Sequence, residues 1–184
     1  NFLVLDNSIF LFSLNLLKIS FILLTEEPNL LANIRHVPIV FTSIETAEII
    51  KYASNSFLAT KIAFINEVAD LCEVTGADIQ DVAKAMGMDK RIGSKFLHAG
   101  PGYGGSCFPK DVKAFSATAQ KMGIEFSIAD AVNRSNQERP AKIALKIAKY
   151  YKNNLNSLTL TILGLSFKPN TDDIRESTSL KIAK

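Results

Sequence analysis

A glycine-rich stretch in the middle of the chain delivers one cysteine to the expected start of a helix. Residues 100–111 read Gly-Pro-Gly-Tyr-Gly-Gly-Ser-Cys-Phe-Pro-Lys-Asp, with the cysteine at Cys107. Pro109 suits the first helical position, where a missing N–H costs nothing, and Asp111 falls in the first turn, where the helix dipole favours negative charge. The exposed amide N–H groups of a helix start also stabilise a thiolate. The spacing therefore predicts a nucleophilic cysteine on an active-site loop.

Two plainer interpretations of this loop stay open. Gly100, Gly102 and Gly105 also spell G-x-G-x-x-G. That dinucleotide-binding pattern follows an apolar strand and is followed by an acidic residue at a strand end, whereas the residues on both sides here do not read as strands. The other interpretation is a glycine turn with a buried, inert cysteine. Four neighbouring glycines do not favour core packing of Cys107.

The composition restricts the class of protein. Of the 184 residues, 47% are hydrophobic and 21% charged, which is ordinary for a globular protein with a real core. The net charge of +3 is too small to indicate a nucleic-acid partner. Cys72 and Cys107 are the two cysteines, so no disulfide framework is predicted and a reducing, cytoplasmic compartment is expected. The two histidines show no ligand spacing with them, and no metal site is predicted.

Residues 1–36 are dense in Leu, Ile and Phe, yet they predict neither a membrane span nor a targeting signal. Asp6, Asn15 and Lys18 interrupt the apolar run. A span needs about 20 apolar residues, and a signal peptide needs a small-residue cleavage site. We leave this segment unassigned and expect it to be a remnant of a domain whose other parts are missing.

A long helix is predicted from about Ser43 to Thr75, after a short strand at residues 38–41. Residues 42–45 read as a capping box, apolar residues recur at three- and four-residue spacing, and a glycine follows the end. Such a helix would be about 50 Å long. It is too long for one small core, so we expect it to link domains or to form a subunit interface. Lys51 and Asn55 lie one turn apart on it, either as site residues or as a solvated polar face.

Three further helices are expected. Asp78 caps one that Gly87 ends, a second covers residues 109–122, and a third starts at Ser127, with Pro140 kinking or dividing it. Arg91, just before the glycine loop, could bind phosphate as a fork or could be a surface charge.

The spacing of apolar residues changes near the end of the chain. Residues 158–164 read as a strand, and a loop and a helix start follow, as in the first part of a βαβ unit. The fold expected is mainly α: a helical central domain with a long connecting helix, then the first strand-loop-helix of a truncated Rossmann-like α/β domain. We set the domain bounds at 1–36, 37–155 and 156–184.

Three motifs together resemble the UDP-glucose 6-dehydrogenase family of nucleotide-sugar dehydrogenases. They are A-E-I-I-K-Y-A-S-N at residues 47–55, the glycine loop at 100–111, and G-L-S-F-K with T-D-D-I-R-E-S at 164–168 and 171–177. The match runs from about residue 38 to 184. The glycine loop looks more like UDP-glucose enzymes than like the GDP-mannose or UDP-N-acetylmannosamine branches.

The resemblance implies an NAD-dependent oxidation of UDP-glucose to UDP-glucuronate in two hydride transfers. Cys107 would carry a thiohemiacetal and then a thioester, which water hydrolyses. Lys51 and Asn55 would stabilise the oxyanion and hold the water, and Asp111 would position the water or act as a base. A homodimer or higher homo-oligomer through the central domain is also implied.

The resemblance also implies binding residues. Those expected to contact the UDP-sugar are Lys51, Arg91, Phe96, Leu97, His98, Ala99, Gly100, Gly104, Phe167 and Lys168. Lys110 and Arg175 would reach NAD. Because residues 1–36 do not match the family's NAD domain, the chain is expected to be inactive by itself. A non-catalytic nucleotide-sugar-binding or oligomerisation module stays open as an alternative, as does a GDP-mannose or UDP-N-acetylmannosamine dehydrogenase, while no nucleic acid and no membrane partner are expected.

Overall fold

The computed structural model describes residues 4–5, 9–10, 21–23, 39–156 and 158–184. It divides into two compact units, residues 1–51 and 52–184. Most of the apolar segment 1–36, which we left unassigned, lies outside the described residues.

The first unit contains a small sheet. Its strands are β1 (Val4–Leu5), β2 (Ile9–Phe10), β3 (Phe21–Leu23) and β4 (Ile39–Phe41), in the order β1-β2-β3-β4. The first two pairings are antiparallel and β3 pairs parallel with β4. The short strand expected at residues 38–41 is therefore confirmed as β4.

The long helix is confirmed as α1, Ile44–Thr75. The Thr46 N–H donates to Ser43 Oγ at 3.3 Å at its start. Gly76, at φ +77°, donates its N–H to Cys72 O at 2.8 Å beyond the end. Glycine adopts this left-handed conformation at little cost, and the helix stops there.

The second helix, α2 (Ile79–Met88), has the expected cap, since Asp78 accepts a hydrogen bond from the Gln80 N–H at 2.7 Å. Gly87 does not end it. A Cβ at Gly87 would come within 2.8 Å of Ser94 Cα, so this glycine allows the returning chain to approach the helix. The prediction at this end was wrong because close packing and helix termination both select glycine.

The remaining helices are α3 (Phe108–Lys121), α4 (Ser127–Tyr150) and α5 (Thr178–Ile182). Phe126, not Ser127, is the N-cap of α4, and Pro140 lies inside it without dividing it. The loss of one helical hydrogen bond is tolerated because α4 packs against α3 and against α5.

The strand predicted at residues 158–164 is not formed. A strand is defined by hydrogen bonds to a neighbour, and within the described residues no other segment pairs with this one. Its apolar side chains remain at the surface, with Leu163 92% exposed. The mainly helical fold that we expected is confirmed, but this first element of the α/β domain is not.

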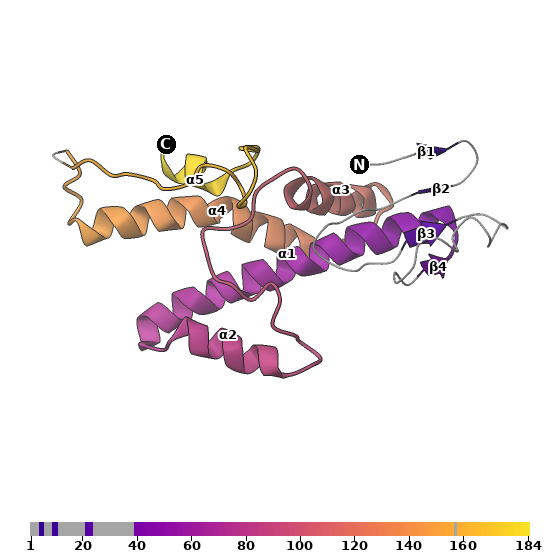
Figure 1. The fold of residues 1–184 in the computed structure, drawn as a ribbon, viewed down its shortest axis with the longest axis horizontal. Coiled ribbons are helices and arrows are strands. Elements are labelled where there is room, and N and C mark those ends of the chain that lie inside the picture. Colours follow the sequence, from indigo (N-terminus) through magenta and orange to yellow (C-terminus); the bar gives the residue numbers. More distant parts are fainter. Residues whose placement is uncertain (1–3, 6–8, 11–20, 24–38, 157) are drawn as a thin grey trace. The chain divides into compact units, whose positions relative to one another are not determined.

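The core of the second unit joins α1, α3 and α4 through small and medium side chains. The buried cluster comprises Ala59, Ala63, Tyr103, Val112, Ala129 and Val132. Alanines on α1 let the neighbouring helices approach closely, and Tyr103 brings the glycine-rich loop into the same core. Figure 1 shows the loop between α2 and α3, with α4 and α5 side by side.

No helix in the described part of the chain is both long enough and apolar enough to cross a membrane.

Candidate active site

Cys107 occupies the predicted position at the start of a helix. It is the N-cap of α3, and its side chain is exposed. Its carbonyl accepts the Asp111 N–H at 2.8 Å, which closes the first turn. Cys72 is buried at 5% exposure on α1, as expected of a core residue. The alternative that Cys107 is a buried, inert cysteine is therefore wrong.

The glycines of the loop serve close packing. A Cβ at Gly102 would lie 2.7 Å from Asn136 Oδ1, and one at Gly105 would lie 2.6 Å from the Phe167 ring. One at Gly104 would collide with the carbonyl oxygen of Glu176. No strand lies between residues 42 and 107, all of which are described. The loop thus lacks the strand that a dinucleotide-binding turn follows.

Asn55 and Asp111 meet inside the protein. Asn55 Nδ2 donates to Asp111 Oδ2 at 2.7 Å, and both side chains are only 2% exposed. The solvated polar face that we kept open for Asn55 is therefore wrong. Lys51 lies four residues earlier on α1, in the first unit, and is half-buried.

The segment after residues 158–164, where a strand was predicted, packs against the glycine-rich loop. The Gly105 N–H donates to Arg175 O at 2.9 Å, and the Phe167 N–H donates to Asp173 O at 3.0 Å. Ser177 Oγ donates to Leu165 O at 2.6 Å and closes this segment. The two motifs, about 60 positions apart in the chain, therefore share one side of the α3 start.

Arg175 and Asp173 form an ion pair on the segment that packs against the glycine-rich loop. The Arg175 Nη2 lies 2.6 Å from Asp173 Oδ2, and this bonding lowers the pKa of Asp173 to about 2. The pKa of Arg175 is raised first by its hydrogen bond with Asp173 and, to a smaller extent, by the charge of Cys107. Arg175 is therefore near enough to Cys107 to interact with a thiolate electrostatically.

Arg91 has a partner too. Its guanidinium forks onto Asp89, with 2.6 Å between Nη2 and Oδ2, while its side chain is 90% exposed. The hydrogen bond with Asp89 raises the pKa of Arg91 and lowers that of Asp89. A phosphate at this fork would have to replace the carboxylate.

The other predicted binding residues differ in their exposure to solvent. Leu97 is buried, His98 and Lys110 are exposed, and Phe96, Ala99 and Gly100 lie between these extremes. Lys168 is exposed, with its Nζ 5.3 Å from the centre of the Phe167 ring. Within residues 52–184 the structure brings Asn55, Asp111, Gly104, Phe167 and Arg175 together around the start of α3. It leaves Arg91 on an exposed turn after α2.

Sequence reasoning missed three polar residues that hold the loop. They are Asn66, Asn136 and Arg139, none of which was assigned a role at the site. The spacing of two of them could have indicated a shared role, because Asn136 and Arg139 lie three residues apart and so project from one side of a helix. Among the described residues no cluster of side chains could hold a metal ion.

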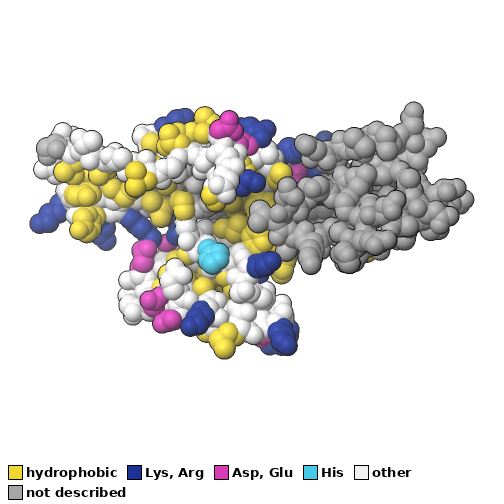
Figure 2. All heavy atoms as spheres, in the orientation of Figure 1, with side chains coloured by type: hydrophobic (Ala, Val, Ile, Leu, Met, Phe, Trp, Pro, Cys, Tyr) yellow, Lys and Arg dark blue, Asp and Glu magenta, His cyan; other side chains and the backbone are white. Residues whose placement is uncertain are grey.

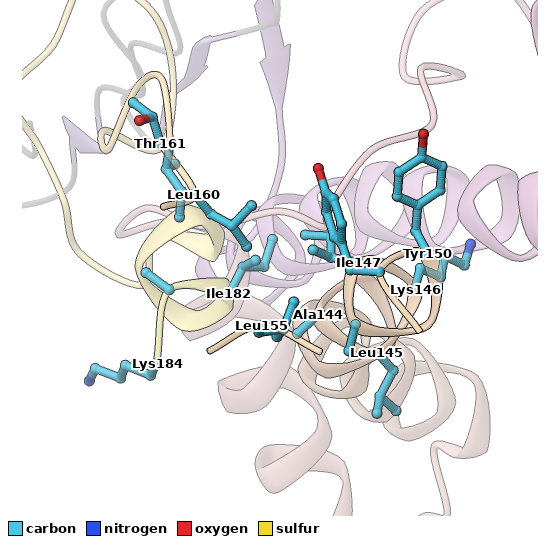
Figure 3. Close-up of a pocket in the computed structure, with 14 residues that line it drawn as sticks. Ala144, Leu145, Lys146, Ile147, Tyr150, Leu155, Leu160, Thr161, Ile182 and Lys184 are labelled. Atoms are coloured by element: carbon cyan, nitrogen blue, oxygen red, sulfur yellow. The ribbon is translucent and has the colours of Figure 1, made fainter. Parts of the chain in front are cut away.

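A large groove lies elsewhere. It has a volume of about 920 Å³ and is lined by the last turns of α4, by Leu155 and residues 160–162, and by the end of α5. Figure 3 shows Tyr150, Leu155 and Ile182 among its mainly apolar walls. None of the residues predicted for the site lines it. Figure 2 shows that hydrophobic side chains gather at the surface over the same part of the chain, where Leu145 is 69% and Tyr150 80% exposed. Among the described residues, the predicted catalytic side chains Asn55, Cys107 and Asp111 lie at the loop and the start of α3, and none of them lines this groove.

The start of α3 combines an exposed cysteine with a buried carboxylate and exposed cations, a set of groups that suits covalent chemistry on an anionic substrate. Family models agree with this class. The central domain of the UDP-glucose/GDP-mannose dehydrogenase family matches residues 45–138, and the UDP binding domain of the same family matches residues 161–184. The chain belongs to the UDP-glucose/GDP-mannose dehydrogenase family.

Individual relatives support the same assignment. The chain is 53% identical over 146 residues to the UDP-glucose 6-dehydrogenase of Rickettsia bellii, which covers 79% of this chain and 34% of the relative. It is 52% identical over 147 residues to the UDP-glucose 6-dehydrogenase YwqF of Bacillus subtilis, covering 80% of this chain and 33% of the relative. The chain thus spans about a third of the length of these relatives.

Solved structures match as well. A UDP-glucose dehydrogenase from Pyrobaculum islandicum superposes with a TM-score of 0.80 at 40% identity, over 89% of this chain and 39% of that one. A UDP-D-ManNAc dehydrogenase from Pyrococcus horikoshii gives a TM-score of 0.68 at 31% identity, over 79% and 34% of the two chains.

Proposed function

We propose that this chain carries the catalytic cysteine and much of the substrate site of an NAD-dependent UDP-glucose 6-dehydrogenase. The observation that carries the proposal is the exposed Cys107 at the start of α3, with the buried Asn55–Asp111 hydrogen bond one turn further along. The branch of the family is supported by relatives above 50% identity that are named UDP-glucose 6-dehydrogenase.

Cys107 is the nucleophile. Its thiolate adds to the C6 carbonyl carbon of the sugar aldehyde, and the carbonyl oxygen takes a proton to give a thiohemiacetal. The aldehyde comes from the C6 alcohol by an earlier loss of a hydride from carbon and a proton from oxygen. Loss of a second hydride from C6, together with the hydroxyl proton of the thiohemiacetal, leaves a thioester. Water then adds to the thioester carbon, the C–S bond breaks, and the products are the carboxylate and the free thiol. The exposed position of Cys107 leaves room for this substrate.

Asp111 and Asn55 serve the water and the oxyanion. Asn55 donates to one carboxylate oxygen of Asp111, which fixes the direction of that side chain behind Cys107. A carboxylate held this way can orient a water molecule or accept its proton. The ammonium group of Lys51 supplies positive charge for the oxygen that becomes negative in the transition state.

The sugar nucleotide is contacted from both sides of the loop. Residues 96–100 lead into it, and of these Leu97 is buried. Gly104 contributes its backbone to the site, and Phe167 and Lys168 contact the ligand from the C-terminal segment, which packs against Gly104. Arg91 binds a phosphate by exchanging its Asp89 partner for the ligand.

The cation pair near Cys107 fits a dinucleotide. Lys110 lies in the first turn of α3 and Arg175 interacts electrostatically with Cys107, and both side chains are exposed. Two exposed cations suit the diphosphate of NAD. When bound, NAD supplies the acceptor for the hydrides that leave C6.

A homo-oligomer is formed through α1. Phe57, Phe64 and Leu71 recur every seven residues on this helix and are 66%, 54% and 62% exposed. Seven-residue spacing places them along one side of the helix, as in a helix-helix interface. Large apolar side chains exposed in a row are typical of surfaces that another protein covers.

The domain bounds follow the same proposal. Residues 37–155 form the central domain, and residues 156–184 form the start of the UDP-binding domain. A cytoplasmic location stays a prediction from the cysteine usage.

The proposal is tested by following NADH absorbance with UDP-glucose and excess NAD. The chain is assayed alone and together with the NAD-binding domain of a related UDP-glucose 6-dehydrogenase. NADH formation only in the mixture, lost with Cys107→Ala, is the expected result. UDP-glucose binding with no NADH in the mixture would instead support a non-catalytic nucleotide-sugar-binding module. Faster reaction with GDP-mannose or UDP-N-acetylmannosamine would move the chain to another branch of the family.

A further inference from the structure

Three polar side chains from α1 and α4 hold the glycine-rich loop by its backbone. Asn66 Oδ1 accepts the Gly100 N–H at 2.7 Å, and Arg139 Nε donates to Gly100 O at 3.0 Å. Asn136 holds both groups of Tyr103: its Oδ1 accepts the N–H at 2.8 Å, and its Nδ2 donates to the carbonyl at 3.0 Å. We call Asn66, Asn136 and Arg139 the loop clamp.

The clamp is itself fixed in place. Arg139 is 5% exposed, and its Nη1 lies 2.6 Å from Asp70 Oδ1. A buried guanidinium is costly unless it is paired and hydrogen-bonded, so Arg139 is confined between Asp70 and the Gly100 carbonyl. Burial acts to raise the pKa of Asp70, but hydrogen bonds from Lys146 and Arg139 outweigh it and hold that pKa below its ordinary value.

The contacts lead from the clamp to the cysteine. Asn136 fixes the backbone of Tyr103, and the Tyr103 ring is buried in the core. That ring packs edge-on against Phe108, with 5.8 Å between the ring centres. Phe108 directly follows Cys107 and is the first residue of α3. The position of Tyr103 therefore affects the position of the start of α3, and with it the position of Cys107.

Gly102 is shaped to this arrangement. It has φ +107°, and a Cβ there would stand 2.7 Å from Asn136 Oδ1. A side chain at residue 102 would push Asn136 away from Tyr103 as well as straining the backbone. The contact with Asn136 therefore explains why residue 102 is glycine, and no bound phosphate is needed to explain it.

We propose that Asn136 is a positioning residue for the chemistry at Cys107, with Arg139 holding the preceding part of the same loop. Neither side chain has to touch the substrate. Both act by keeping residues 100–103 in the conformation from which Cys107 is presented. The expected effect on turnover rests on the proposed function, whereas the expected effect on the conformation of residues 100–103 does not.

Amide hydrogen exchange of the 184-residue chain, followed by NMR without substrate, tests the effect on the loop. In Asn136→Ala the Tyr103 amide should exchange about tenfold faster or more, because its acceptor is lost. The Gly105 amide, which bonds to Arg175 O, should change less than threefold. Gln137→Ala is the matched control, because Gln137 is exposed and its amide bonds only to Asn133 within the described residues.

Turnover in the mixture with the supplied NAD-binding domain tests the consequence. Asn136→Ala should lower kcat by roughly 10- to 100-fold, the loss expected for a reacting group displaced by about 1 Å, with KM within about threefold. Asn136→Asp keeps the acceptor for the Tyr103 N–H but loses the donor to its carbonyl. It should protect the amide yet recover kcat only in part, and it serves in place of Asn136→Ala if that variant does not fold.

Unchanged exchange at Tyr103 in Asn136→Ala, or faster exchange with unchanged kcat, would overturn the proposal. A loss confined to KM would also overturn it, because Asn136 would then act on binding. If the unsubstituted mixture shows no turnover, the proposed function fails, and the exchange at Tyr103 still decides whether the clamp holds the loop.

Discussion

Asn55 of α1 and Asp111 of α3 lie 56 residues apart in the sequence and share a buried hydrogen bond of 2.7 Å. This contact joins the long helix to the helix that begins at Cys107. It ties a predicted oxyanion group to a predicted base, so the two cannot be positioned independently.

Removal of this bond should cost stability. Asn55→Ala is expected to lower the free energy of unfolding by about 1 to 3 kcal/mol, because a buried carboxyl group loses a donor. Urea unfolding of Asn55→Ala, Asp111→Ala and the double variant gives the coupling energy. A coupling below about 0.5 kcal/mol would show that the contact is not an energetic link.

Cys107 should react with iodoacetamide much faster than Cys72. Cys107 is exposed at a helix start, whereas Cys72 is 5% exposed, so at neutral pH we expect about a tenfold or greater difference. Mass spectrometry of the folded chain identifies the labelled peptide, and Cys107→Ala shows the rate at Cys72 alone. Equal rates at the two cysteines would remove the basis for treating Cys107 as the nucleophile.

Lys51→Ala should slow turnover by about 100-fold or more with a smaller effect on UDP-glucose binding, if the ammonium stabilises the oxyanion. Lys51→Arg should not restore the rate, because a planar fork does not replace a point charge. Steady-state kinetics and calorimetric titration in the mixture separate the two effects. A near-normal rate in either variant would leave Lys51 as a non-catalytic residue.

The stability of the chain should fall at high pH because of Tyr103. Burial raises the pKa of this hydroxyl to about 12. An unfolded tyrosine ionises near pH 10, so between these values the native state holds one proton more than the unfolded state. The stabilisation is complete below about pH 10 and is lost as the pH rises toward about 12.

Tyr103→Phe tests this dependence, because it removes the titrating group and keeps the ring. Between about pH 9 and about pH 11.5, the wild type should lose roughly 1 to 2 kcal/mol relative to the variant in urea unfolding. Below pH 10 the variant should be at least as stable, since the buried hydroxyl has no hydrogen-bond partner among the described residues. Parallel pH profiles of the two proteins would contradict the shift.

The purified chain should self-associate through α1. Sedimentation velocity should show dimers or larger species, and Phe57→Ser with Phe64→Ser should shift them toward monomer, because both side chains are more than half exposed. Leu145→Ser is the control, since Leu145 is equally exposed but belongs to the groove at the end of α4. An equal shift with the control would place the contact at that groove.

The sequence by itself determined much of the local structure around Cys107. Periodicity and capping residues predicted α1 and the start of α3 to within one residue, and they predicted the Asp78 cap of α2. These features depend on neighbours within one or two helical turns, so the chain near each residue contains the information. The three motifs also pointed to the family that the comparisons then showed.

Only the tertiary structure decided which distant groups meet. The Asn55–Asp111 bond and the hold of Asn136 on Tyr103 join residues 56 and 33 positions apart, and no local pattern specifies such pairs. The strand predicted at residues 158–164 failed for the same reason, since strand formation depends on a partner elsewhere. Gly87 and Gly102 show the same dependence. The sequence predicted a helix end at Gly87 and left a dinucleotide-binding turn open at Gly102, but packing against Ser94 and Asn136 is what requires glycine at these positions.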